Sequence, residues 1–410
     1  PRNGERRCDM INVSSQQPLI QEAIPTPLEN PPKKAGANSL IEVVQGFLSG
    51  TYEFRFNAIT QRLLVRIRGA DEPFHYLDDY EFNSILKGIK AQNIRCSKET
   101  LLMILKSDYV ESFDPFISFL DDLPKWDGKD YVAELARSVK VTQPEHWAKC
   151  LKKWLVALVA SLRDKDTVNQ TAIVLSEPQG IGKTTWFHTI LPPEFQEFIH
   201  EGYVHTKDKE TSVKIAECVL ILMDELENLS DKSIDGVKQL MTQKGTALRR
   251  AYTTITQYYH RRASFAGTVN KKHFLKDLTG NRRFLCFDVE KINLQHNIPI
   301  KQLFAQLVHL YKNGFQFWFD ESEIEELNKM NAEFRDISVE EEAFVNHFEK
   351  CSAENEDAIF LTTTQIQQML VQKTGYKSLS TQALGHVLRD MKVEREKRAG
   401  VYGYIVKAKS

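Results

Sequence analysis

The chain has 410 residues, of which 27% are charged and 42% hydrophobic, and its formal net charge is −1. These values are ordinary for a globular protein of two to four domains, and they exclude a basic surface over the whole chain, so a nucleic-acid contact must come from a local patch. Its six cysteines are widely spaced and form no C-x-x-C pair, which argues against a zinc site or disulfide framework and for a reducing cytoplasm. No apolar run approaches 18 residues and the N-terminus is polar and Pro-rich, so we expect neither a membrane span nor a signal peptide.

Four segments are predicted along the chain. Residues 1–38 are rich in proline and lack periodicity, which predicts a flexible tail or linker. The remaining segments are an N-terminal α+β assembly domain (39–145), a P-loop ATPase or helicase domain (146–335) and a winged-helix-like C-terminal domain (340–410). The chain is thus predicted to be a multidomain α/β protein whose central domain has the three-layer αβα core of a P-loop NTPase. Because it begins at Pro1 rather than Met, we expect it to be part of a longer protein.

The N-terminal domain shows structural patterns without a catalytic constellation. An amphipathic helix is predicted at 41–48, and alternation in 52–56 and 60–68 around a turn predicts a β-hairpin. Two further helices are predicted near 78–89 and 97–106. We therefore expect this domain to serve packing and assembly.

The central domain is organised around one strand–loop–helix stretch. The apolar run Ala172–Leu175 predicts a buried strand, the loop contains Gly180-Ile-Gly-Lys-Thr-Thr185, and a helix-like segment follows. Glycines let backbone N–H groups surround phosphate oxygens, and the helix that follows directs its positive end at the anion. The position of the first glycine in G-x-x-x-x-G-K-[ST] is Glu177 here. The alternative is a chance Gly-rich turn before a helix.

This loop predicts a site for ATP and Mg²⁺. Lys183 is expected to reach the β- and γ-phosphates and Thr184 to ligate Mg²⁺. The residues predicted to contact the nucleotide are Pro178, Gln179, Gly180, Ile181, Gly182, Lys183, Thr184 and Thr185.

Two later strands end in polar residues that suit hydrolysis. The apolar strand from Cys218 ends in Asp224 and Glu225; Asp224 is predicted to hold Mg²⁺, and Glu225 to polarise the attacking water. A strand from Arg262 ends in Asn270, which is predicted to sense the γ-phosphate. The alternatives are a buried strand capped by surface acids and an asparagine that only starts a turn.

Two arginines, Arg282 and Arg283, lie in a tight turn before another strand. One of them is expected to reach into the neighbouring subunit's site and stabilise transition-state charge, while the other forms a structural ion pair. The sequence does not say which does which.

The segment Thr246–Arg262 predicts a strand, a turn and a second strand in which basic and aromatic residues alternate. Such a mixture suits a pore loop that grips a nucleic-acid backbone and stacks on bases; the alternative is a hairpin with a solvated face. The predicted nucleic-acid contacts are Arg249, Arg250, Tyr258, Tyr259, His260 and Arg261.

The C-terminal segment follows a winged-helix pattern. Two helices are predicted at 362–370 and 380–391, followed by a basic turn at 392–400 and a strand at 402–406. The second helix or the hairpin could contact DNA, or the module could bind protein, and both alternatives stay open.

Taken in order, these motifs resemble the virulence-associated protein E family. The resemblance covers roughly residues 110–290 and is carried by the following motifs: Gly180-Ile-Gly-Lys-Thr184, Asp224-Glu225, Gly267-Thr-Val-Asn270, Thr279-Gly-Asn-Arg-Arg-Phe284 and, upstream, Asp114-Pro115 and Trp126-Asp-Gly128. Members are P-loop ATPases of phages, plasmids and genomic islands, similar to superfamily 3 helicases and D5-like primase-helicases. The resemblance implies an AAA+-type hexameric ring that hydrolyses ATP between subunits and translocates on single-stranded or forked DNA, with a fused or associated primase.

We therefore expect an ATP-dependent DNA helicase or translocase of the replicative type. Two other functions fit parts of the sequence. One is a stand-alone P-loop kinase or nucleotide hydrolase, which needs no arginine from a neighbour. The other is an ATP-binding DNA-recognition switch without motor activity.

Overall fold

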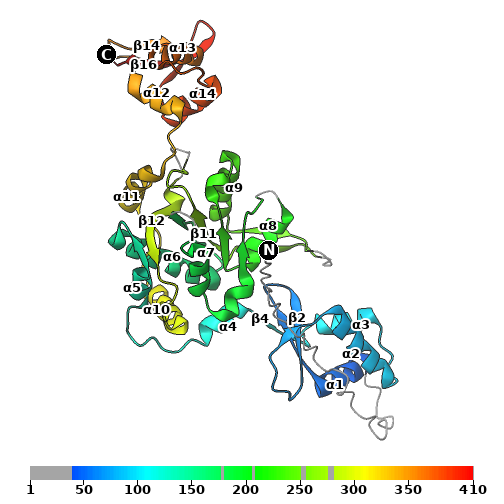
Figure 1. Cartoon of the computed structure of the whole chain (residues 1–410). Coiled ribbons are helices and arrows are strands. Elements are labelled where there is room, and N and C mark those ends of the chain that lie inside the picture. Colours follow the sequence, from blue (N-terminus) through cyan, green and yellow to red (C-terminus); the bar gives the residue numbers. More distant parts are fainter. Residues whose placement is uncertain (1–38, 177–179, 206–207, 251–254, 276–280, 410) are drawn as a thin grey trace, which may run out of the picture. The chain divides into compact units, whose positions relative to one another are not determined.

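The computed structural model describes residues 39–176, 180–205, 208–250, 255–275 and 281–409 (Figure 1). The predicted tail at 1–38 and the predicted loop residues Pro178 and Gln179 lie outside these ranges. The chain divides into two compact units, Pro1–Asp114 and Pro115–Ser410. Both contain helices and mixed or antiparallel sheets, which confirms the predicted multidomain α/β class. No helix in the described residues is long and apolar enough to span a bilayer.

The first unit is a four-stranded sheet with helices on one face. Its strands are β1 (Tyr52–Asn57), β2 (Arg62–Ile67), β3 (His75–Tyr76) and β4 (Glu111–Phe113), in the order β3-β2-β1-β4. The predicted hairpin is β1–β2, and β4 pairs parallel to β1. Its helices are α1 (Leu40–Thr51), α2 (Asp79–Ala91) and α3 (Lys98–Leu105). Side chains at Ser39, Asp78 and Ser97 cap their N-termini.

The core of the first unit lies between these helices and the sheet. Its fully buried members are mainly helical residues such as Val44, Ile85 and Leu101, and Leu63 contributes from β2. Phe54 and Phe56 of β1 pack against the same cluster. Since strand side chains alternate between faces, the intervening residues of β1 and β2 lie on the opposite face.

The second unit is built on a six-stranded sheet in the order β5-β12-β6-β11-β8-β7. The strands are β5 (Val139–Val141), β6 (Ala172–Ser176), β7 (Ile199–Glu201), β8 (Leu220–Met223), β11 (Ser264–Val269) and β12 (Phe284–Ile292). All neighbours pair parallel except β5, which pairs antiparallel to β12. The predicted strands at 172–175, 218–223 and 262–270 are therefore β6, β8 and β11. In such sheets ligands bind at the carboxyl ends of strands, where the strand order reverses; here that point is β6, between β11 and β12.

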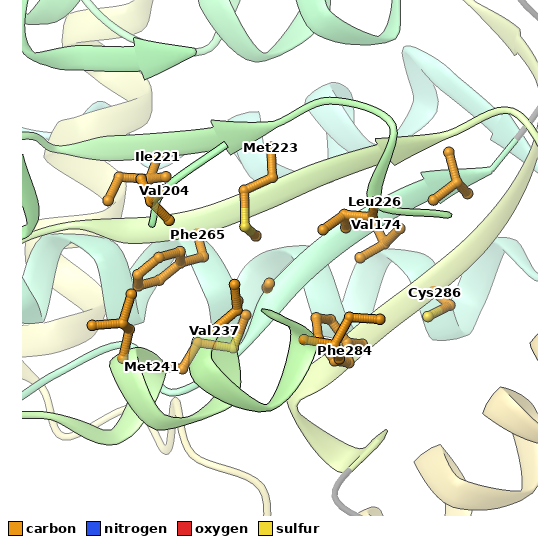
Figure 2. Packing of buried hydrophobic residues seen from close by; sticks show 14 of the residues in the cluster. Val174, Val204, Ile221, Met223, Leu226, Val237, Met241, Phe265, Phe284 and Cys286 are labelled. Atoms are coloured by element: carbon orange, nitrogen blue, oxygen red, sulfur yellow. The ribbon is translucent and has the colours of Figure 1, made fainter. Parts of the chain in front are cut away.

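Helices cover both faces of this sheet. They are α4 (Pro115–Asp121), α5 (Tyr131–Arg137), α6 (Pro144–Arg163), α7 (Lys183–Thr189), α8 (Lys209–Glu217), α9 (Asp231–Thr242), α10 (Ile300–Lys312) and α11 (Glu321–Asn331). Val174 and Phe265 face a cluster that includes Val237 and Met241 of α9 (Figure 2). Toward the other face, the indole N–H of Trp154 in α6 donates to the Phe265 carbonyl at 3.1 Å. This three-layer arrangement fixes the strand ends that carry the candidate site.

The boundary predicted between residues 145 and 146 is wrong. The units divide between Asp114 and Pro115, because β5 joins the sheet of the second unit through its pairing with β12. A three-residue strand has too little alternation to be recognised, and its partner lies far along the chain.

The C-terminal part of the second unit contains its own small core. Its elements are α12 (Val339–His347), β13 (Phe348–Lys350), β14 (Ile359–Leu361), α13 (Thr363–Thr374), α14 (Thr381–Asp390), β15 (Arg395–Arg398) and β16 (Val401–Ala408). The two predicted helices are α13 and α14, and the predicted final strand is β16. The segment predicted as a basic turn contains β15, which pairs antiparallel to β16. The hairpin therefore begins earlier than charge alone suggested.

Candidate nucleotide site

The loop between β6 and α7 requires glycine at two positions. The backbone φ angles of Gly180 and Gly182 are +114° and +87°, values that residues with a Cβ rarely adopt. A Cβ added to Gly182 would also lie 3.0 Å from Cδ1 of Leu294. Leu294 follows β12, and no sequence pattern linked it to this loop. Ile181 is half-buried and Thr185 is exposed, so the loop keeps an accessible side.

Lys183 connects this loop to the end of β11. It is the first residue of α7 and is 7% exposed. Its Nζ donates to the carbonyl of Val269 at 3.0 Å and to Oδ1 of Asn270 at 3.2 Å. The predicted phosphate-binding lysine and the predicted sensor asparagine are therefore in direct contact.

Asp224 joins the loop to β8. Its Oδ1 accepts hydrogen bonds from the hydroxyls of Thr184 and Thr268, each at 3.0 Å. Thr268 was not predicted, because a threonine within β11 is typical of any strand. Carboxylate and hydroxyl oxygens are ligands that Mg²⁺ accepts, so the Thr184–Asp224 pair has the chemistry expected of a magnesium site.

The two glutamates after β8 occupy different positions. Glu225 is exposed, has a φ of +54°, and accepts a hydrogen bond from Asn228 at 2.9 Å. Oε1 of Glu227 accepts the backbone N–H of Asn270 at 2.9 Å, and its buried Oε2 has no hydrogen-bond partner among the described residues. Sequence reasoning missed Glu227, although the repeated acid in Asp224-Glu225-Leu226-Glu227 was a possible signal.

Comparisons with known proteins bear on this arrangement. Residues 120–336, more than half of the chain, match the Virulence-associated protein E-like domain. The chain belongs to this family. The search of curated proteins found no match.

Two solved structures have a distant likeness to the chain. "The apo structure of NrS-1 C terminal region (305-718)" is 12% identical, covers 91% of this chain and 100% of its own, and has a TM-score of 0.49. "The A form apo structure of NrS-1 C terminal region-CTR(305-718)" is 12% identical, with coverages of 90% and 100% and a TM-score of 0.46. At these scores the likeness supports no argument about activity.

The VapE-like match contains every predicted site residue, but the structure does not bring all of them together. Lys183, Thr184, Asp224 and Asn270 meet at the carboxyl edge of the sheet. Arg282 and Arg283 instead lie in a short 3₁₀ turn, Asn281–Arg283, just before β12. Since Phe284 of β12 pairs with Ala172 of β6 in a parallel register, these arginines lie at the amino edge. The five residues of β6 separate the two edges by about 17 Å.

The two arginines of the VapE-like domain line a cleft of about 570 Å³. Lys244 and three consecutive aromatic residues, Phe317, Trp318 and Phe319, also line it. Burial and the neighbouring Arg282 charge lower the pKa of Arg283. Neither arginine forms an ion pair in the described part of the chain, although Asp166 also lines the cleft.

The predicted basic hairpin of the VapE-like domain is present as β9 (Gly245–Leu248) and β10 (Gln257–His260), paired antiparallel. Tyr258 is 55% exposed, and its ring meets that of His260 edge-on at 5.1 Å. Arg250 lies over the ring of Tyr259 at 4.4 Å and pairs with Glu217. Arg249 is exposed. Tyr258 and Arg249 are thus the accessible members of the predicted set.

The predicted nucleic-acid contact at Arg261 is wrong. Arg261 is 1% exposed, and its guanidinium donates to four backbone carbonyls at 2.6–3.0 Å: Gln243, Ala263, Asn169 and Met241. Burial lowers the pKa of this arginine to about 9, which still leaves it charged at neutral pH. A guanidinium enclosed in this way holds the hairpin base to the sheet and cannot reach a ligand.

Proposed function

We propose that the chain binds Mg·ATP at the carboxyl end of β6 and hydrolyses it. The observation that carries this proposal is the convergence of Lys183, Thr184, Asp224 and Asn270 from three separate segments. Their side chains are joined by hydrogen bonds of 3.0–3.2 Å. Polar residues that follow strands by chance would not be expected to contact one another in this way.

Each residue has a distinct role in the proposed reaction. Lys183 binds the terminal phosphates and moves from its present acceptors to them, while Thr184 and Asp224 hold the magnesium ion, which would neutralise charge on the phosphates. Glu225, which is exposed just after β8, orients and polarises the attacking water. Asn270 contacts the γ-phosphate, and Glu227 fixes its backbone.

We further propose that sites are completed between copies of the chain. Arg282 and Arg283 lie about 17 Å from the loop of their own copy, in a cleft that the basic side chain of Lys244 also lines. A guanidinium supplied by a neighbour stabilises transition-state charge on the phosphoryl group. This geometry favours a ring, with hexamers as in the predicted assembly, over a stand-alone kinase or hydrolase.

The proposed output is translocation on single-stranded or forked DNA, as part of replication of a phage or mobile element. Arg249 and Tyr258 of the β9–β10 hairpin supply the charge and the ring that such contacts need. The C-terminal part, in which the helices α12, α13 and α14 precede the β15–β16 hairpin, is proposed to be a winged helix. A switch without motor activity is the remaining candidate, but it has no use for the exposed Glu225.

Complementation between inactive variants tests the proposal. We expect Lys183→Ala and the Arg282→Ala/Arg283→Ala double variant each to lose ATP hydrolysis by at least about 100-fold. Mixing the two should restore part of the activity, because some interfaces then combine an intact loop with intact arginines. Lys312→Ala, at the exposed end of α10, is the matched control and should hydrolyse ATP normally.

The outcomes separate the candidates. No hydrolysis by the wild-type chain, with or without single-stranded DNA, would reject the ATPase. Hydrolysis without recovery on mixing would favour the stand-alone enzyme. If DNA changes neither the rate of ATP hydrolysis nor the oligomeric state, the motor function is rejected.

A further inference from the structure

The first unit presents a second sheet face that its core does not use. Helices α1, α2 and α3 lie together on one side of the β3-β2-β1-β4 sheet (Figure 1). Leu63, Phe54 and Phe56 point to that side. Side chains of β1, β2 and β3 that point to the opposite side, together with the neighbouring Phe74 and Phe113, form a surface that we call the arginine–aromatic face. Its members are Arg55, Arg62, Arg66, Phe74, Tyr76 and Phe113.

Guanidinium groups and rings alternate across this face. The Cζ of Arg55 lies 4.6 Å from the ring centre of Phe74 and 5.9 Å from that of Phe113. Arg66 lies over Phe74 at 4.5 Å, and Arg62 over Tyr76 at 3.8 Å. Stacking on a ring fixes the plane of a guanidinium but leaves its N–H edge free to donate. The arginines are therefore held in place with donors available.

The charges on the face are only partly compensated. Arg66 forms an ion pair with Glu53 at 2.6 Å. Arg55 and Arg62 are exposed and form no ion pair within the ranges that the structure describes. Glu111 lies opposite Arg55 in the β1–β4 register without pairing to it. Two oriented positive charges beside stacked rings favour a polyanion with planar groups over an apolar partner.

We propose that the arginine–aromatic face binds single-stranded nucleic acid. Arg55 and Arg62 hold backbone phosphates, and bases stack on the rings and guanidinium planes around Phe74 and Tyr76. Duplex bases are already stacked, so their faces cannot make this contact. The surface belongs to the first unit, whereas the β9–β10 hairpin belongs to the second. Binding to it requires neither ATP nor a neighbouring copy, so the proposal can be tested independently of the proposed ATPase.

Nucleotide-free binding by the whole chain tests this. Fluorescence anisotropy would measure affinity for labelled 30-mers of dT and rU and for a duplex across a salt series. Arg55→Ala/Arg62→Ala should weaken single-strand binding about tenfold or more and reduce the slope of log K against log [salt] by about 1.4, or 0.7 per lost phosphate contact. Lys87→Ala/Lys90→Ala, the same charge change on exposed positions of α2, should leave both unchanged.

A second variant separates stacking from charge. Phe74→Leu should weaken binding by about tenfold with the salt slope unchanged, and ultraviolet cross-links to a bromouracil strand should map to residues 52–76. Basal ATP hydrolysis without DNA should be unaffected in all these variants. Three results would each overturn the proposal: affinities of the Arg55/Arg62 variant equal to those of the Lys87/Lys90 control, cross-links confined to the second unit, or duplex binding as tight as single-strand binding. Equal affinities are also the result expected if the face docks a protein instead.

Discussion

Arg261 shows how burial reverses the meaning of a basic residue. Its four acceptors are the carbonyls of Met241 at the end of α9, Gln243 just before β9, Asn169 shortly before β6 and Ala263 just before β11. The planar guanidinium donates to all of them, whereas an ammonium has only three donors and no fork geometry. The residue therefore acts as a structural clamp.

Removing this clamp should destabilise the second unit without a specific effect on nucleic acid. Arg261→Ala leaves four carbonyls without their donor and should lower the free energy of unfolding by about 3–5 kcal/mol. Urea denaturation followed by tryptophan fluorescence would measure it. Lys271→Ala, at an exposed position, should change stability by less than about 0.5 kcal/mol. Weaker DNA binding by Arg261→Ala at full stability would contradict the clamp.

Glu227 is expected to position the sensor rather than react. Because its Oε1 holds the backbone N–H of Asn270 at 2.9 Å, Glu227→Ala should lower kcat for ATP by about 10–100-fold while leaving KM near the wild-type value. Glu227→Gln keeps an acceptor oxygen and should recover most of the rate. If Gln is as slow as Ala, the carboxylate charge itself is needed and the positioning role is wrong.

Between elements, β11 and the turn after β8 approach each other closely at Gly267. A Cβ on Gly267 would lie 2.2 Å from Cδ1 of Leu226 and 3.2 Å from the carbonyl of Met223. The turn that contains Leu226 also carries Glu225 and Glu227. Only a strand without a side chain at this point lets that turn approach Asn270.

The Gly267–Leu226 contact predicts a compensating pair. Gly267→Ala should cost about 1–3 kcal/mol through overpacking, and Leu226→Ala should also destabilise because it removes a buried side chain. Their combination should cost less than the sum, because the shortened Leu226 makes room for the new methyl group. A double-mutant cycle by urea denaturation would measure the coupling, and strict additivity would contradict it.

Sequence patterns located the elements whose periodicity is local. The helices α1, α2 and α3, the β1–β2 hairpin and the strands β6, β8 and β11 fall where amphipathic periodicity, alternation and apolar runs predicted them. The short strands β5 and β15 were not predicted, because they are too brief to show alternation. Their positions depend on pairing with β12 and β16. Local signals cannot report such distant partners.

The site residues that lie in local motifs were predictable from the sequence, and those that depend on contacts between strands were not. Lys183, Thr184, Asp224 and Asn270 stand in recognisable motifs. Thr268, Glu227 and Leu294 were missed because their relevance comes from side-chain contacts across strands. Arg261 was misassigned because sequence shows that a residue is basic but not that carbonyls surround it.

At the scale of the molecule, the two units should unfold separately. All five tryptophans lie in the second unit, at positions 126, 147, 154, 186 and 318, so tryptophan fluorescence reports that unit alone. Ile104→Ala, in the core of the first unit, should cost about 2–5 kcal/mol and shift the circular-dichroism transition but not the fluorescence midpoint. Equal shifts in both signals would show that the units unfold together.

Because the loop and the arginines lie at opposite edges of the sheet, their placement also determines how many complete sites an assembly contains. If sites are shared as proposed, each copy contributes one half-site at each edge of its sheet, and copies must associate head to tail. An open row of subunits then always has one loop without arginines and one pair of arginines without a loop. Closure removes both defects at once, so turnover per subunit should rise with row length and reach its maximum only when the last copy meets the first.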